Sequence, residues 1–334
     1  MLFLTKSYGE LNFSTLKNNS IVGLMYHRFD ENKYPSTNIK LEDFKKQLKE
    51  IEKSGFKYID IKQIHEIVKK SDNEKYILLT IDDAFQSFYE KAWPILKDKN
   101  IPFILFVNTE SVGNKGYMSW SEISELIKNK ITTIGNHSHS HDYLVDKNKE
   151  EITNDLNKAI KIFKKEINES PIYFSYPFGE WSNNFKEIVM NLNFKYAFGQ
   201  HSGVIDKSKN IFELPRFPIN EKYGEIERFK SIINSIPFPY KKIFPEEKYL
   251  KDIDNPPEVK IIFFDDLKNI KNITCFSNEG NIWRNSDIEI LKENTIKINL
   301  KDKFKSERGR INCTKREDDG KWRWLGIQFT IKNY

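Results

Sequence analysis

From Ile21 to Ile219 the sequence alternates short apolar segments of β type with amphipathic helical segments. This alternation is typical of parallel strands joined by helices, because a crossover between parallel strands needs a helix-sized connection. It predicts seven strands, at residues 21–27, 56–60, 75–82, 102–107, 131–137, 172–177 and 195–199. Seven such strands favour a parallel (β/α) barrel.

The segments between these strands carry helix signals. Residues 41–53 place apolar side chains at spacings of three and four and end before Gly55, which predicts a helix with one buried face. Ser119 followed by Glu122 predicts a capping box at the start of another helix. The segment 149–168 has apolar residues on one side and Lys and Glu on the other. These apolar faces predict contacts with the core.

The pattern changes after residue 236. Residues 237–258 are rich in Pro and charge, which predicts a linker or a surface crossing. Beyond them, apolar segments are separated by turn-forming residues with no convincing helix, which predicts a β sandwich. We therefore divide the chain into a barrel at residues 1–240, a linker at 241–258 and a β-rich accessory domain at 259–334.

Tryptophan and arginine alternate near the C-terminus, at Trp322, Arg323 and Trp324. Successive residues of a strand point to opposite faces, so each face would carry one residue type. Indoles match sugar faces and guanidinium groups match anionic oxygens, which would suit a glycan or phosphate surface. Core tryptophan with solvated arginine is the alternative, and we favour it.

Composition excludes several classes of protein. Hydrophobic residues make up 38% and charged residues 31% of the chain, as in globular proteins, and no apolar run is long enough to span a bilayer. The net charge of +6 comes mostly from dispersed lysines, so solvated helix faces explain it and no nucleic-acid partner is expected. The sequence does not indicate an oligomeric state.

The N-terminus and the cysteines bear on the compartment. The opening MLFLTKSYGELNFS does not resemble a secretory signal, so the chain as written is expected in the cytoplasm, and outside it only if a leader is missing or a partner exports it. Cys275 and Cys313 could form one bridge, but without a secretion signal we expect reduced core thiols.

Polar clusters follow four of the predicted strands. The clusters are His27 after the first strand, Asp82 and Asp83 after the third, His137 to His141 after the fifth, and Ser175 to Gly179 after the sixth. In parallel β/α barrels the reacting groups lie where strands end and loops begin. We therefore expect these clusters to converge at one mouth.

The types and spacing of these residues indicate a metal site. His137 and His141 would face the same way on one helical turn, and Asp83 would complete a set that leaves positions open for water and substrate, as in catalytic zinc sites. Asp82 would then be free as a general base. Alone, an Asp pair is more often a helix cap or solvated turn, but the order along successive strands favours the metal site. His139 is expected to point away.

The segments TIDDAF, HSHSH and SYPFG resemble the first three motifs of the NodB-type polysaccharide deacetylases, also called carbohydrate esterase family four. The resemblance covers roughly residues 20 to 220. It implies a distorted β/α barrel that removes an acetyl group from a sugar with a divalent metal, most often Zn²⁺, with Co²⁺, Mn²⁺ or Ni²⁺ as alternatives. It also implies that Asp82 is the base and that Asp83, His137 and His141 are the metal ligands.

Two positions depart from the family pattern. Members often have Arg where this chain has Ser175, and Arg216 in LPRFP is the expected substitute that orients the base. Many members also have a histidine near the end of the barrel that acts as the general acid, yet no His follows His201 in this chain. LMYHRF resembles the opening motif of the circularly permuted poly-N-acetylglucosamine deacetylases, in which an N-terminal His donates the proton, so His27 is the expected acid. A strand-end His bonded to a backbone group is the alternative.

The third motif completes the predicted site with Tyr176, Pro177 and Phe178. The backbone N–H near Phe178 would stabilise an oxyanion, while Tyr176 or Trp181 would either stack on a sugar or lie in the core. The resulting hypothesis is a metal-dependent hydrolase that removes an N-acetyl or N-formyl group from a sugar of a polysaccharide or glycoconjugate. Hydrolysis of a non-sugar amide and an inactive glycan-binding barrel are the alternatives.

Overall fold

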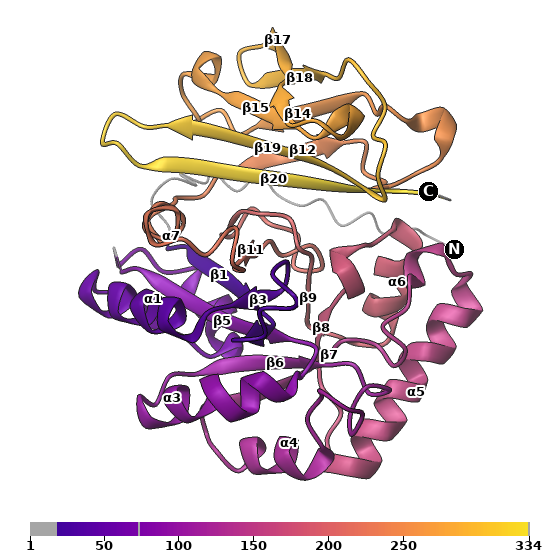
Figure 1. Ribbon diagram of the computed structural model, residues 1–334. Coiled ribbons are helices and arrows are strands. Elements are labelled where there is room, and N and C mark those ends of the chain that lie inside the picture. The colour runs from indigo at the N-terminus through magenta and orange to yellow at the C-terminus, as the bar shows by residue number, and fades with distance from the viewer. Residues whose placement is uncertain (1–18, 73, 333–334) are drawn as a thin grey trace, which may run out of the picture.

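The computed structural model describes residues 19–72 and 74–332, so the N-terminal segment used to judge secretion lies outside it. A curled, mostly parallel sheet with flanking helices forms the larger part, and two further β-sheets lie beside it (Figure 1). The predicted fold class, a distorted parallel (β/α) barrel with a smaller all-β region, is confirmed. Within the described residues, no helix has the length and apolar character needed to cross a membrane.

The barrel sheet has nine strands in the order β10-β1-β5-β6-β7-β8-β9, with β11 also on β1 and β4 also on β5. They are β1 (Ile21–Tyr26), β4 (Lys57–Tyr58), β5 (Tyr76–Asp82), β6 (Phe103–Val107), β7 (Thr132–Asn136), β8 (Tyr173–Ser175), β9 (Tyr196–Phe198), β10 (Val204–Ile205) and β11 (Phe217–Pro218). Only β10 runs antiparallel to its neighbour among the described pairs. Each predicted strand is present, whereas β10 and β11 are too short to leave a periodic pattern. A separate pair, β2 (Arg28–Phe29) and β3 (Asn38–Ile39), follows β1.

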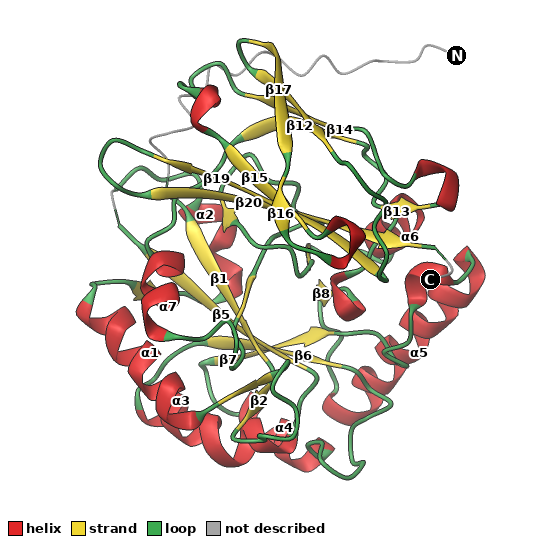
Figure 2. Ribbon diagram, turned by 45° about the horizontal axis from the view of Figure 1, so that its top comes forward, coloured by secondary structure: helices red, strands yellow, loops and turns green. Residues whose placement is uncertain are grey.

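Helices cover the outside of this sheet (Figure 2). They are α1 (Leu41–Lys53), α2 (Ile64–Ile67), α3 (Trp93–Asp98), α4 (Trp120–Ile127), α5 (Lys149–Ile167), α6 (Asn183–Asn191) and α7 (Ile226–Ile233). The predicted helix at 41–53 has the expected bounds, and the capping box between Ser119 and Glu122 is present. Both predictions are confirmed because helix periodicity and capping depend only on residues that are close together in the sequence.

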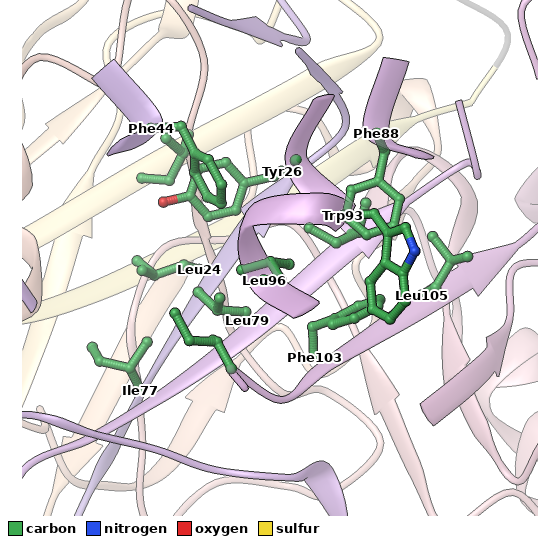
Figure 3. Close-up of a cluster of buried hydrophobic side chains, with 14 of the residues drawn as sticks. Leu24, Tyr26, Phe44, Ile77, Leu79, Phe88, Trp93, Leu96, Phe103 and Leu105 are labelled. Atoms are coloured by element: carbon green, nitrogen blue, oxygen red, sulfur yellow. The ribbon is translucent and has the colours of Figure 1, made fainter. Parts of the chain in front are cut away.

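The main core lies between the sheet and the helices (Figure 3). Figure 3 labels ten of its side chains: Leu24, Tyr26, Phe44, Ile77, Leu79, Phe88, Trp93, Leu96, Phe103 and Leu105. Burying one large apolar side chain stabilises a fold by roughly 1.5–3 kcal/mol. The packed strands β1, β5 and β6 therefore form a rigid platform for the polar residues at their ends.

Two sheets make up the C-terminal region, with strand orders β12-β14-β18-β17 and β13-β20-β19-β15-β16. The strands are β12 (Tyr240–Phe244), β13 (Tyr249–Leu250), β14 (Val259–Phe263), β15 (Thr274–Ser277), β16 (Arg284–Asn285), β17 (Asp287–Lys292), β18 (Thr295–Asn299), β19 (Arg308–Arg316) and β20 (Trp322–Ile331). Both sheets contribute to one hydrophobic cluster, as in a sandwich. The predicted linker includes β12 and β13, which pair with β14 and β20, so these residues are part of the sheets. The three-part domain division stays a proposal.

The alternating Trp and Arg residues of β20 differ from expectation. The Arg323 side chain is buried and donates to the backbone oxygen of Pro237, whereas 39% of Trp322 is exposed. Trp324 packs edge-to-face against Phe217 of the barrel with ring centroids 5.5 Å apart. The interpretation of core tryptophan with solvated arginine is therefore wrong for Trp322 and Arg323, whereas Trp324 packs against the core of the barrel. The reason is that β20 lies at the junction between the C-terminal sheets and the barrel.

The expectation of reduced thiols is also wrong. Cys275 and Cys313 form a disulfide. They are directly opposed on the antiparallel strands β15 and β19, with Cα atoms 4.0 Å apart. The register of two strands this far apart in sequence decides the pairing, and neither residue type nor spacing reveals that register.

Candidate active site

The two predicted aspartates diverge at the end of β5. Asp82 is the last strand residue, and the next two residues, Asp83 and Ala84, have left-handed φ angles of 75° and 56°. Such a conformation costs a non-glycine residue about 1–2 kcal/mol, so the surroundings must hold it. The Asp83 N–H donates to the Phe106 oxygen at 3.0 Å, and the Met118 N–H donates to the Ala84 oxygen at 2.9 Å. This turn directs the neighbouring carboxylates to different partners.

Asp82 is paired with Arg216, and neither side chain is exposed. The guanidinium donates from Nη1 to Oδ1 at 2.7 Å and from Nη2 to Oδ2 at 2.9 Å. It also donates to Ser175 Oγ at 2.8 Å, to Thr80 Oγ1 at 3.0 Å and to the Gly199 oxygen at 3.1 Å. Arg216 thus contacts both the expected base and the serine at the position where family members often have arginine.

Competing effects act on the protonation of Asp82. Burial acts to raise the pKa of this carboxyl, but the charge of Arg216 and weaker electrostatic interactions with the neighbouring His137 and His27 outweigh burial and hold the pKa at about 2. Asp82 is therefore an ionised proton acceptor at neutral pH.

We expect the Arg216→Met variant to lose about 3–5 kcal/mol of unfolding free energy, because removal of one partner leaves the other charge buried and unpaired. Urea denaturation of the parent and the variant measures this loss. The double variant Asp82→Asn/Arg216→Met is the control, and we expect it to recover part of the loss because no lone carboxylate remains. A Met variant within about 1 kcal/mol of the parent would contradict a stabilising role for the pair.

Asp83, His137 and His141 form a second cluster, in which one potential ligand atom from each residue lies within 4.8 Å of the others. Asp83 Oδ1 is 3.5 Å from His137 Nε2 and 3.3 Å from His141 Nε2. Ligand atoms about 2.0–2.1 Å from a tetrahedral zinc ion lie roughly 3.4 Å from each other, so the two separations between Asp83 and the imidazoles suit one cation.

The environment of His137 also suits a metal ligand. Its ring is buried, and Nδ1 lies 2.7 Å from the Ser175 backbone oxygen. In the described part of the chain, Nε2 has no hydrogen-bond partner. Burial lowers the pKa of His137 to about 4, so the ring is neutral, as a ligand must be. The backbone contact on one nitrogen and the free second nitrogen match the arrangement by which proteins orient metal-binding imidazoles.

The loop that carries both histidines is not helical, so the expected helical turn is wrong. Ser138 and His141 have left-handed φ angles of 71° and 54°, which reverse the chain and bring His141 back toward His137. The carboxylate of Asp155, on α5, accepts two backbone N–H groups of the loop at 2.8 and 3.0 Å. Asp155 was missed at the sequence level because it lies on the polar side of an amphipathic helix, where a charged residue is unremarkable.

His139 points away from the cluster, as expected. Its Nδ1 lies 2.9 Å from Thr109 Oγ1, and its Nε2 lies 3.5 Å from Glu110 Oε1. His27 lies between β1 and β2 with 9% exposure, near enough to Asp82 to lower the pKa of that carboxyl. Its role as the acid stays a prediction.

Three side chains of the third motif region are buried. Tyr176 has no exposed surface and donates its hydroxyl to the Phe212 backbone oxygen at 3.2 Å. Pro177 and Trp181 are buried as well. Neither Tyr176 nor Trp181 can stack against a sugar in this arrangement, so the core alternative holds for both.

Phe178 is the side chain of this motif that reaches the cluster of Asp83, His137 and His141. Its ring centroid lies 4.6 Å from that of His141 and 4.5 Å from that of Tyr143, on which it stacks. The Arg308 guanidinium, from β19, lies 5.1 Å from the same ring. Tyr143 and Arg308 do not belong to a recognisable sequence motif, and only the folded chain brings them to the site.

The fold and the cluster together define a class, that of β/α-barrel proteins with an Asp-His-His set suited to a metal ion at the ends of their strands. Residues 69–197 match the family model described as polysaccharide deacetylase. Over these residues the chain is similar to the polysaccharide deacetylase family.

Three individual proteins show which deacetylases the chain is similar to. The chain is 25% identical over 233 residues to poly-beta-1,6-N-acetyl-D-glucosamine N-deacetylase of Staphylococcus aureus, a match that covers 61% of this chain and 80% of the relative. Its fold is similar to that of the deacetylase PplD of Streptococcus pyogenes, with a TM-score of 0.59, 20% identity and coverage of 65% of this chain and 99% of that one. IcaB from Ammonifex degensii gives a TM-score of 0.56 at 22% identity, with coverage of 66% and 99%.

Proposed function

We propose that this protein is a metal-dependent hydrolase that removes the N-acetyl group from a sugar of a polysaccharide or glycoconjugate. The observation that carries the proposal is the Asp83, His137 and His141 cluster beside the ionised Asp82. The family match supports sugar N-deacetylation. The Staphylococcus aureus relative supports a polymer of N-acetylglucosamine as the substrate class.

Each predicted residue then has one task. A divalent ion, with Zn²⁺ as the first candidate, would be held by Asp83, His137 and His141 and would polarise the amide carbonyl and acidify a water molecule. Asp82 would take the proton of that water, and Arg216 keeps Asp82 ionised and fixed in orientation. Water oxygen bonds to the carbonyl carbon, the C–N bond breaks, and His27 would give a proton to the departing amine. The backbone N–H near Phe178 would stabilise the negative oxygen.

Chelation tests this proposal. Acetate release from oligomers of N-acetylglucosamine is expected to fall at least about 100-fold when the metal is removed, because loss of a Lewis acid costs several kcal/mol of transition-state stabilisation. Zn²⁺, Co²⁺, Mn²⁺ or Ni²⁺ added after dialysis should restore it. Acetate release that survives complete metal removal would contradict the metal dependence. Activity on simple amides without activity on any sugar would favour the non-sugar alternative.

The proposal includes a location for the protein outside the cytoplasm. Disulfides persist mainly in oxidising surroundings, so the Cys275–Cys313 bridge favours a location outside the reduced cytoplasm. Such a location would agree with a polysaccharide substrate at the cell surface.

A further inference from the structure

The turn Pro177–Gly179 that carries Phe178 has an unusual backbone. Phe178 and Gly179 have successive left-handed φ angles of 57° and 70°. A side chain at Gly179 would lie 2.4 Å from the backbone nitrogen of Gln200, so glycine is required there. The N–H groups of Gly179 and Glu180 donate within the turn, to the Tyr176 and Pro177 oxygens at 2.8 and 3.0 Å. The turn therefore sets the direction of the Phe178 N–H and the position of the Phe178 ring against His141.

A residue from the other end of the chain holds this turn. Gln328, on β20, donates from Nε2 to the Phe178 oxygen at 3.2 Å and to the Gly179 oxygen at 3.3 Å. Its own amide oxygen accepts from Arg310 Nε at 3.3 Å, and 6% of the side chain is exposed. One buried amide therefore satisfies both carbonyls of the left-handed pair, and a second strand fixes its orientation.

The same sheet contacts the turn at a second point. Arg308, on β19, donates from Nε to Glu180 Oε1 at 2.6 Å. Glu180 follows the turn directly and is 2% exposed. Burial raises the pKa of Glu180 to about 7, although Arg308 acts in the opposite direction. Figure 1 shows β19 and β20 running along the side of the C-terminal region that faces the barrel.

We infer that the C-terminal sheet is a working part of the deacetylase site and that Gln328 is a positioning residue, which holds the Phe178–Gly179 turn in the conformation needed to stabilise the oxyanion. This inference rests on the proposed function and assigns a task to the C-terminal region. Gln328 donates to two backbone oxygens of the turn and accepts from Arg310, and it has no hydrogen bond to Asp83, His137 or His141, so its replacement leaves these three side chains in place.

The Gln328→Glu variant tests the inference. Glutamate keeps the shape and the bond from Arg310 but has no N–H to donate. We expect kcat for acetate release from N-acetylglucosamine oligomers to fall about 10–100-fold, the range for loss of a group that orients the residues of a site. We expect KM and the affinity for Zn²⁺ to change less than about threefold, because neither metal ligands nor sugar contacts are removed. If this variant does not fold, Gln328→Met carries the same test.

Tyr249→Phe is the matched control. Tyr249, on β13 of the same sheet, donates its hydroxyl to Asp146 of the barrel region, so the variant removes one hydrogen bond across the same junction without touching the turn. We expect it to retain the parent kcat. An active parent with unchanged kcat in the Gln328 variants, or an equal loss in Tyr249→Phe, would overturn the positioning role. A parent that releases no acetate with metal bound would overturn the proposed function instead.

Discussion

Replacing Asp83 with alanine is expected to abolish metal binding in the micromolar range and to lower acetate release at least about 10³-fold, because the change removes the anionic ligand and with it the Lewis acid. Asp83 Oδ1 is the atom that both imidazole Nε2 atoms approach, at 3.5 and 3.3 Å. Without it, two neutral rings remain, and they hold a divalent ion weakly. Calorimetric titration with Zn²⁺ and an acetate assay measure the two effects.

Asp142→Ala is the matched control for this substitution. Asp142 follows His141 and forms an exposed ion pair with Lys147 at 3.2 Å, so its removal changes the charge near the site without removing a proposed ligand. We expect near-parent zinc affinity and activity from it, since exposed pairs contribute about 0–1 kcal/mol. An Asp83→Ala protein that binds zinc and releases acetate like the parent would refute the proposed metal centre.

The Asp82→Asn variant is expected to bind zinc normally but to lose about 10²–10⁴-fold in kcat, the usual contribution of a positioned general base. Asparagine has nearly the same shape, so it can still accept from Arg216, but its amide does not take a proton from water at neutral pH. The result therefore separates proton transfer from metal binding. Steady-state kinetics on N-acetylglucosamine oligomers, together with zinc titration, provide the measurement.

Asp206→Asn controls for the loss of a buried charge. Asp206 pairs with Lys209 at 3.1 Å, and both side chains are 2% exposed, so this substitution also disrupts a buried ion pair. We expect reduced stability with parent-like kcat. If Asp82→Asn leaves the biological function of the protein intact, an inactive glycan-binding barrel becomes the better interpretation.

The relation between Asp82 and Arg216 shows where sequence reasoning needed the fold. Ser175 stands where members of the family that the chain resembles often have arginine, which predicts that a distant arginine compensates, with Arg216 as the candidate. The structure brings Arg216 to Asp82 across 134 residues of chain and adds Ser175 as a third partner. The bidentate geometry and the complete burial of the pair are properties of the packed strands β5, β8 and β11, and no local pattern encodes them.

In the third motif, by contrast, the sequence leaves open which aromatic side chain reaches the site. Residue types left open whether Tyr176 or Trp181 faces a sugar, and the structure buries both. Phe178 reaches the cluster instead, because two left-handed residues turn the chain there and Gln328 holds their carbonyls. Left-handed residues other than glycine have no reliable sequence signature, so the exposed member of the motif could not be chosen in advance.

The sequence by itself determined the seven main strands, the helices at 41–53 and 149–168, the capping box at Ser119 and the order of polar clusters at the strand ends. Periodicity, capping and motif spacing depend on residues close in the chain, where local physical chemistry decides the outcome. Only the tertiary structure decided the Arg216 geometry, the Cys275–Cys313 bridge and the contact of β20 with the Phe178 turn. Each of these joins distant segments, and their meeting depends on strand register and packing over the whole chain.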